Sequence, residues 1–497
     1  MTLSILIWLP AAAAVIGALA PGRWAGRVAA LGALAALGIA IDYVVRFHTG
    51  HAGLQFVTDR MWISALGIHY KLGLDGLNVV LVLMTAVIFL AAIVAANLRS
   101  WPRPGLFYLQ LGLAESAVLG AFCTQDLILF VAFFDLMLVP FYFLTGVWGG
   151  ENRVRATTKL FIYTLVGSLL MLAAAIATGV TAEPSGGSLT FALSDLQKLH
   201  LSNSSQDWIF LCFAAAFFVK MPAFPVHGWM PDAYQEMPLP ALMAFASVLS
   251  KVAAYGLLRI VLPLFPHATA HFQELVMLLA LGSILYGSAM AFTTTRARLI
   301  VGYSSVAQLG FIVLGIFALR QTGAQGALLQ MVNHAIVTAP LLFIVGMVAA
   351  RHGGSEDLRD MGGTAFRAPV LATLFLIVSL ALLAMPGSSN FAGEFLILLG
   401  VFQSKVAIAF VAATGVVLAS VYALRAYIRM MHNRPGPKTE SREMTRSEGL
   451  VLVPLVLVIL ALAVYPQVAL KKSDPSVQLT VLRAHSPLIV FGNGVQP

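Results

Sequence analysis

The sequence has few charged residues, very few cysteines and no long polar segments. Only 10% of its 497 residues are Asp, Glu, Lys or Arg, against roughly 25% in soluble domains. So few charges cannot cover the several water-soluble cores that this length would otherwise imply. Apolar residues make up 59% of the chain, and no collagen-like period is present, which excludes disordered and fibrous classes. The composition therefore predicts an all-α, polytopic membrane protein.

Cofactor and nucleotide motifs are missing as well. Cys123 and Cys212 are too few for a disulfide scaffold or an iron–sulfur site. A disulfide between them stays open, although buried thiols are favoured. No CxxC, haem, Walker A or dinucleotide motif occurs. We therefore expect no metal and no cofactor in this chain, and the net charge of +9 indicates cytoplasmic loops rather than nucleic-acid binding.

Long apolar runs fill most of the chain instead. A membrane-spanning helix needs about 20 mostly apolar residues, and about fourteen runs approach that length. They lie at 2–20, 26–45, 77–97, 106–122, 126–147, 157–179, 208–222, 238–262, 272–292, 299–318, 324–349, 369–403, 406–430 and 448–466. The odd-numbered connections carry 18 Lys and Arg residues, whereas the even-numbered ones and the tail carry nine. Because cytoplasmic loops collect positive charge, we expect both termini outside.

Proline interrupts two of these runs. The stretch FFVKMPAFPVHGWMPD contains Pro222 and Pro225, and MPGSSNFAGEF contains Pro386 followed by Gly387. Proline frees a backbone carbonyl, which in a membrane must be buried in protein or face a water-filled cavity. The breaks fall in the seventh and twelfth runs, and paired breaks indicate inverted repeats around a transport site. The alternative, that membrane prolines are simply common, is weaker for the pair than for either break.

Ionisable side chains inside apolar runs are costly and usually functional. The main candidates are Asp135, Lys220, Lys251, His334 and Glu394. Burial disfavours a charged lysine and a nearby carboxylate restores the charge, so a moving carboxylate can gate a proton. The competing interpretation is a static set of ion pairs, with His334 as a simple interhelical hydrogen bonder. We expect the two lysines, His334 and Glu394 to line one hydrated path at mid-membrane depth, with Lys251 and Glu394 facing away from lipid.

Two acids are weaker candidates. Glu115 lies in the fourth run, and Asp126 lies where the fifth run begins. An aspartate at that position is typical of a helix cap.

Six stretches of the sequence resemble the antiporter-like subunits of proton-pumping NADH:quinone oxidoreductase, respiratory complex I. They are FFDLMLVPFYFLTGVWGG, FFVKMPAFPVHGWMPDAY, VLSKVAAYGLLR, RLIVGYSSVAQLGF, MVNHA and MPGSSNFAGEF, and the resemblance covers about residues 70–430. The glutamate of NFAGEF resembles the M-type chain, whereas L-type, N-type and Mrp antiporter chains usually carry lysine there. The resemblance implies about 14 transmembrane helices and two inverted five-helix repeats with discontinuous helices 7 and 12. The implied divisions are 1–105 for helices 1–3, 106–262 and 272–430 for the repeats, and 431–497 for a cytoplasmic loop, a last span and the tail.

The resemblance also implies roles for single residues. Lys220 matches the lysine of the first broken helix, Lys251 the connecting lysine, His334 the central histidine and Glu394 the exit-side acid. Asp135 stands where relatives have glutamate, and it is shorter by about 1.5 Å. We therefore expect either closer helices or a bridging water between it and Lys220. Gln308 stands where many relatives have histidine; it cannot titrate but can hold a water.

The implied function is proton translocation by a membrane-arm subunit of a complex I-like enzyme, driven by quinone reduction elsewhere. The chain would be a multi-pass protein of a bacterial cytoplasmic membrane, with both termini on the periplasmic side and no redox centre. NADH, FMN, iron–sulfur clusters and quinone would belong to other subunits. Its partners would be the L-type and N-type chains, small membrane subunits and lipid, with no nucleic acid.

Three alternatives compete with this function. A subunit of an Mrp-type cation/proton antiporter is disfavoured by Glu394. A related membrane-bound hydrogenase shares the motifs and stays open. A membrane scaffold is disfavoured because it would not retain so many ionisable groups in the bilayer, at several kcal/mol each.

Overall fold

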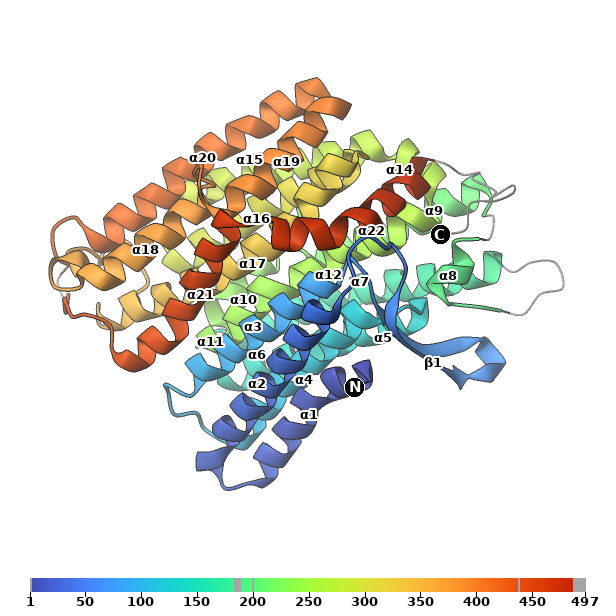
Figure 1. Cartoon of the computed structure of the whole chain (residues 1–497). Helices are drawn as coiled ribbons and strands as arrows, with labels where there is room; N and C mark the ends of the chain where they lie inside the picture. The colour runs from blue at the N-terminus through green and yellow to red at the C-terminus, as the bar shows by residue number, and fades with distance from the viewer. Residues whose placement is uncertain (1, 183–188, 199–200, 437–438, 486–497) are drawn as a thin grey trace.

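The computed structural model describes residues 2–182, 189–198, 201–436 and 439–485, and most of these residues are helical (Figure 1). The long helices are α1 (Leu3–Leu19), α2 (Gly22–Arg46), α3 (Val79–Ala96), α4 (Pro104–Cys123), α7 (Arg153–Thr181), α9 (Asn203–Lys220), α15 (Gln273–Thr293), α16 (Ala297–Phe317), α17 (Gln321–Ala350), α19 (Ser389–Ser404), α20 (Val406–Met431), α21 (Arg446–Val464) and α22 (Gln467–His485). The shorter ones are α5 (Leu127–Leu136), α6 (Leu138–Trp148), α8 (Leu193–Leu196), α10 (Met230–Glu236), α14 (Pro266–His271) and α18 (Pro369–Leu382).

Residues 239–264 form one helical rod of mixed type. In it α11 (Leu239–Ala244), α12 (Ser250–Gly256) and α13 (Leu262–Leu264) alternate with two π-helical segments, η2 (Phe245–Leu249) and η3 (Leu257–Val261). π-helical turns are rare in proteins, and many of those that are found lie at functional sites. Lys251 lies between the two, so the rod is irregular on both sides of a candidate residue.

Each apolar run of the sequence coincides with one helix, a pair of helices or, at 238–262, the mixed rod. Within the described residues, eleven helices are long and apolar enough to cross a membrane, and α1 and α18 are apolar but shorter. The polytopic, mostly helical fold is therefore confirmed. The number of crossings and the inverted repeats stay predictions.

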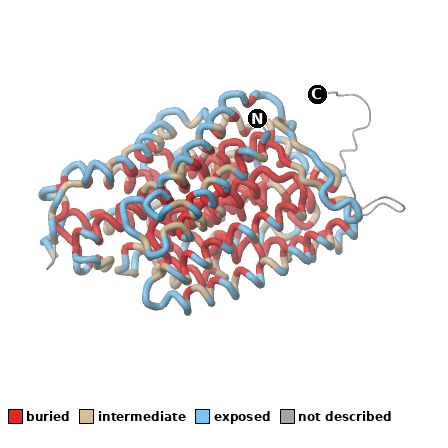
Figure 2. The backbone as a smooth tube through the Cα atoms, turned by 90° about the horizontal axis from the view of Figure 1, so that it is seen from below, coloured by how far each residue is buried: buried red, intermediate tan, exposed pale blue. Residues whose placement is uncertain are grey.

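Three helical elements form the centre of the bundle. The most apolar stretches of the 239–264 rod, α16 and α17 are entirely buried, whereas those of α2, α7 and α21 are buried over only about a third of their residues. Figure 2 shows the same distribution, with buried residues along the middle of the bundle and exposed ones along its outline. A polar group on a central helix is shielded from lipid by its neighbours, so the centre is where buried charges can be held.

A β-hairpin follows α2 and was not apparent in the sequence. Strands β1 (Gln55–Ile63) and β2 (Ile68–Leu74) are antiparallel and joined by a short 3₁₀ turn, η1 (Ser64–Leu66). Asp59 lies opposite Lys71 and accepts a hydrogen bond from His69 at 2.7 Å. Burial alone would raise the pKa of the Asp59 carboxyl, but hydrogen bonds from His69 and Lys71 outweigh it and hold that pKa below its usual value.

The tail also forms structure that the sequence did not predict. Helix α22 turns away from the end of α21, lies across the bundle and contacts α3, α13, α14 and α17 (Figure 1). Small and hydroxyl side chains form its buried face, and Ser476 Oγ accepts from the Gly76 amide at 3.0 Å. Asp474 accepts from Gln321 and Gln325 of α17, each at 2.7 Å. Cys123 and Cys212 are separate free thiols.

The arginine distribution yields a test of the orientation in the membrane. Glu440→Cys and His51→Cys, each in a chain lacking Cys123 and Cys212, place exposed thiols in connections predicted to lie inside and outside. A maleimide that cannot cross membranes should label residue 51 in intact cells, and residue 440 only in inverted vesicles. Labelling of residue 440 in intact cells would show that the predicted orientation is wrong.

Candidate functional site

The first broken helix holds a direct ion pair. Lys220 is the last residue of α9, and its Nζ lies 2.5 Å from Oδ1 of Asp135 near the end of α5. The lysine side chain is 2% exposed and the aspartate side chain 36%. Ser168 of α7 donates to the same carboxylate oxygen at 2.6 Å, and the Phe134 ring lies 4.2 Å from the ammonium. The shorter acid therefore reaches its lysine by direct contact rather than through a bridging water.

The protein itself satisfies the backbone at this break. Pro222 and Pro225 lie in the non-helical link between α9 and α10. The carbonyl of Val219, in the last turn of α9, accepts a hydrogen bond from the buried indole of Trp229 at 2.8 Å. The Phe224 amide donates to Ser283 Oγ of α15 at 2.9 Å. An unpaired carbonyl in hydrocarbon costs several kcal/mol, and these contacts remove part of that cost.

Lys251 is fully buried and bound only to neutral oxygens. Its Nζ donates to the Ala246 carbonyl and to Ser250 Oγ, both at 3.2 Å. No carboxylate among the described residues forms an ion pair with it. An ammonium at this position therefore lacks a counter-charge of the kind that Asp135 provides for Lys220.

His334 lies on α17, which contacts α12, the helix that carries Lys251. The imidazole is fully buried, and Nε2 lies 3.2 Å from Thr338 Oγ1. Nδ1 has no hydrogen-bond partner among the described residues. Buried polar atoms are nearly always paired with protein or water, so this nitrogen is suited to exchange a proton with a mobile partner.

Glu394 is held by two glutamines from neighbouring helices. Gln308 of α16 donates to its Oε1 at 2.7 Å, and Gln330 of α17 donates to Gln308 at 2.8 Å and to Oε1 at 3.4 Å. The other carboxylate oxygen has no partner among the described residues. Gln330 was missed from the sequence; its signal was its position four residues before His334, one helical turn away on an apolar helix.

The second break carries several polar side chains without partners among the described residues. Helix α18 ends at Leu382 and α19 begins at Ser389, with Pro386 and Gly387 between them. Gly387 has φ +91°, a conformation that favours glycine. Asn333, beside His334, donates to the Ser389 carbonyl at 2.6 Å. The hydroxyls of Ser388 and Ser389 and the amide of Asn390 have no partners among the described residues.

The two weaker acids have different environments. Asp126 caps α5, because Oδ1 accepts from the Ile128 and Leu129 amides at 3.0 and 3.1 Å and Oδ2 accepts from the His69 amide at 3.0 Å. This is the structural role typical of such a residue. Glu115 of α4 is fully buried, and neither of its carboxylate oxygens has a hydrogen-bond partner among the described residues.

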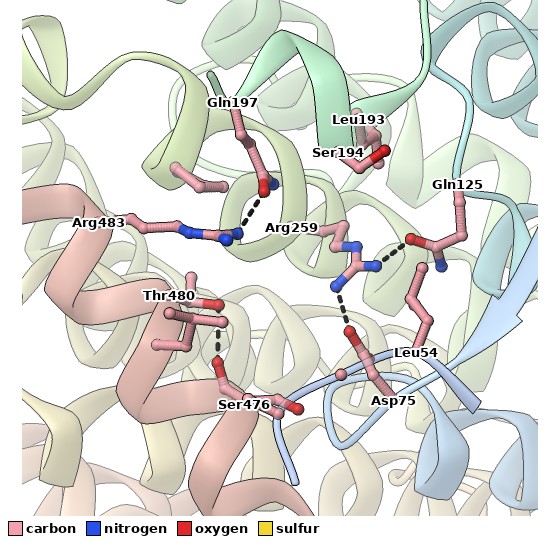
Figure 3. Close-up of a pocket in the computed structure, with 14 residues that line it drawn as sticks. Leu54, Asp75, Gln125, Leu193, Ser194, Gln197, Arg259, Ser476, Thr480 and Arg483 are labelled. Carbon is pink, nitrogen blue, oxygen red and sulfur yellow. Dashed lines mark hydrogen bonds and ion pairs between the residues drawn. The ribbon is translucent and has the colours of Figure 1, made fainter. Parts of the chain in front are cut away.

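A polar pocket of about 190 Å³ lies between the β-hairpin side of the bundle, the end of the 239–264 rod and α22 (Figure 3). Arg259, two helical turns after Lys251, is bound there to Asp75 and Gln125. Arg483 of α22 is bound to Gln197. The Arg259–Asp75 pair was not foreseen from the sequence, because the two residues are 184 positions apart.

The candidate residues thus form two bonded groups with two residues between them. Asp135 is bonded to Lys220, and Gln308 and Gln330 are bonded to Glu394. Lys251 and His334 lie on α12 and α17, and successive contacts join α9 to α12, α12 to α17 and α17 to α19. Lys251 and Glu394 are both buried, as expected of residues that do not face lipid.

Comparisons with known proteins agree with this geometry. The family described as "NADH:quinone oxidoreductase/Mrp antiporter, TM" matches residues 124–420. NADH-quinone oxidoreductase subunit M of Rhodobacter capsulatus is 36% identical, over 98% of this chain and 97% of its own length. A chain of respiratory complex I from Thermus thermophilus with bound NADH has a TM-score of 0.89 at 30% identity, covering 97% of this chain and 100% of that one. A chain of the Mrp complex from Dietzia sp. DQ12-45-1b has a TM-score of 0.83 over 97% and 99%, but at 21% identity it supports only the fold.

The glutamine pair at Glu394 is testable by its energetics. Gln308→Leu removes the 2.7 Å donor and should lower the free energy of unfolding by about 1–3 kcal/mol, because a buried acceptor loses its partner. Unfolding would be followed by titrating the purified chain in detergent with SDS. The exposed Gln403→Leu serves as a control and should change stability by less than about 0.5 kcal/mol.

A double variant separates this interaction from general damage. Gln308→Leu/Glu394→Leu removes both partners and should lose less stability than the two single changes added together. Strictly additive losses would contradict the coupling.

Proposed function

The chain belongs to the family of membrane subunits shared by NADH:quinone oxidoreductase and Mrp antiporters, and we propose that it is the M-type proton-translocating subunit of a bacterial respiratory complex I. The observation that supports the M-type assignment is Glu394. The second broken helix carries an acid here, held by two glutamines, where a lysine is usual in the Mrp and other antiporter-like chains. An Mrp antiporter subunit is the second candidate, favoured by the shared fold and disfavoured by this residue.

The proposed path begins at the Asp135–Lys220 pair and ends at Glu394. Lys251 and His334 carry the proton between them, on helices that contact one another. Gln308 and Gln330 cannot titrate, so they orient the Glu394 carboxylate rather than exchange protons with it. Asn390 and Glu394, which follow the second break, and Nδ1 of His334 have buried polar atoms without partners among the described residues. Such atoms are typical binding points for water, which would complete the path.

The switching element in this proposal is the distance between Asp135 and Lys220. At 2.5 Å the ion pair favours a charged lysine. Separation of the two would leave the lysine without a counter-charge in a buried site, and the proton would then be released towards Lys251. The interruption between α5 and α6 at Met137, two residues after Asp135, is a local irregularity at which such a movement could occur.

The energy for this movement comes from outside the chain. We propose a translocase subunit without a redox centre, in which NADH oxidation and quinone reduction take place in other subunits that hold FMN and the iron–sulfur clusters. The partners in the membrane arm are the L-type and N-type antiporter-like chains and the small membrane subunits. Both termini lie on the periplasmic side of the cytoplasmic membrane, in line with the arginine distribution.

Substitutions at Asp135 test the switch. Asp135→Glu keeps a carboxylate and should retain most of the proton pumping. Asp135→Asn keeps an oxygen that can accept from Ser168 but removes the counter-charge of Lys220, so pumping and coupled quinone reduction should fall together, by about tenfold for each 1.4 kcal/mol of lost interaction. Electron transfer from NADH to the peripheral iron–sulfur clusters should persist. Proton uptake and turnover would be measured in membranes that carry each variant.

The chain offers a matched control for this experiment. Asp232 and Lys159 form another aspartate–lysine pair, at 2.7 Å, but the Lys159 side chain is 35% exposed, whereas that of Lys220 is 2% exposed. Asp232→Asn should therefore leave pumping near the wild-type level. Normal pumping in Asp135→Asn would show that this acid is structural and that the switch lies elsewhere.

A further inference from the structure

A group of two histidines and an aspartate lies outside the proposed proton path. Asp207 is in the second turn of α9, and His267 and His271 are in α14, which contacts α9 (Figure 1). His271 Nδ1 lies 3.3 Å from Oδ2 of Asp207, and His267 Nε2 lies 3.9 Å from Oδ1. One possible ligand atom from each residue lies within 4.8 Å of the other two.

The arrangement of this group is suited to a ligand. The two histidines are four residues apart on one helical turn, the spacing that places two imidazoles on one face towards a metal. The main-chain amide of His267 donates to Gln206 Oε1 at 3.0 Å, which holds α14 against the start of α9. Independently, Oδ1 of Asp207 is buried and has no hydrogen-bond partner among the described residues. A carboxylate oxygen in that state needs a cation or a donor.

We propose that Asp207, His267 and His271 form a site for a divalent transition-metal ion of the Zn²⁺ class. Two imidazole nitrogens and one carboxylate oxygen are preferred ligands of Zn²⁺, and Ni²⁺ and Cu²⁺ favour similar sets. The His271 side chain is 56% exposed, so water can complete the coordination. Mg²⁺ and Ca²⁺ prefer oxygen ligands and are poorly matched to two imidazoles.

A metal ion bound at this site would link two helices of the bundle. It would join α9, whose far end carries Lys220, to α14, which lies between the 239–264 rod and α15 and also contacts α22. The bound ion would thus tie the outer end of the first broken helix to the link between the two halves of the chain. Loss of either histidine or of the aspartate would release that tie.

Equilibrium binding of Zn²⁺ to the purified full-length chain in detergent tests the site. The wild type should bind one Zn²⁺ that a thousandfold excess of Mg²⁺ does not displace. Asp207→Asn and His271→Asn should each weaken this binding by about tenfold or more. His51→Asn removes another exposed histidine and should leave the binding unchanged. Unaltered binding in both Asp207→Asn and His271→Asn, or displacement by Mg²⁺, would overturn the proposal.

A second measurement needs no variant. Diethyl pyrocarbonate modifies neutral imidazoles, and Zn²⁺ should protect His267 and His271 of the wild-type chain while His51 stays reactive. Equal modification of all three residues with and without Zn²⁺ would also overturn the assignment.

Discussion

A charged or unpaired polar group in a membrane interior must find its partners within the protein, and the arrangement of this bundle follows from that requirement. The 239–264 rod, α16 and α17 are enclosed by the other helices, and they carry Lys251, Gln308 and His334. The peripheral helices α2, α7 and α21 expose mostly apolar side chains. The outer faces are thus left mostly to apolar side chains, while the enclosed centre holds groups that would each cost several kcal/mol in hydrocarbon.

The same requirement explains how the two broken helices persist. At the first break, the Trp229 indole and the Ser283 hydroxyl bond to backbone groups beside the interruption, the Val219 carbonyl and the Phe224 amide. At the second, Asn333 bonds to the Ser389 carbonyl, but several side chains nearby remain unpartnered among the described residues. Unpartnered side-chain atoms thus lie at both breaks, Nδ1 of His227 at the first and several atoms at the second, and they keep hydrogen-bonding capacity that water can use.

Two elements outside the bundle brace it from the predicted outer side. The β-hairpin provides the chain that leads into Asp75, and Asp75 is bound to Arg259 at the end of the buried rod. Helix α22 lies across α17 and is joined to it by Asp474 and two glutamines. Neither element is predicted by a search for long apolar runs in the sequence. The hairpin is half exposed with little alternation, and α22 is amphipathic with a proline inside it, so no hydropathy pattern of spanning length marks either one.

The sequence by itself determined the membrane class, the positions of the apolar helices, both breaks and most of the buried ionisable residues. Each of these depends on local composition: about 20 apolar residues, a proline, or a charge within an apolar run. Only the tertiary structure decided which of those residues are partners. It showed that Asp135 contacts Lys220 directly and that Gln330 completes the Glu394 cluster. It also joined Arg259 to Asp75 and placed His267 and His271 beside Asp207. These pairings connect residues that are far apart in the chain. Which side chains meet is determined by how the helices pack, and a local sequence pattern does not show that packing.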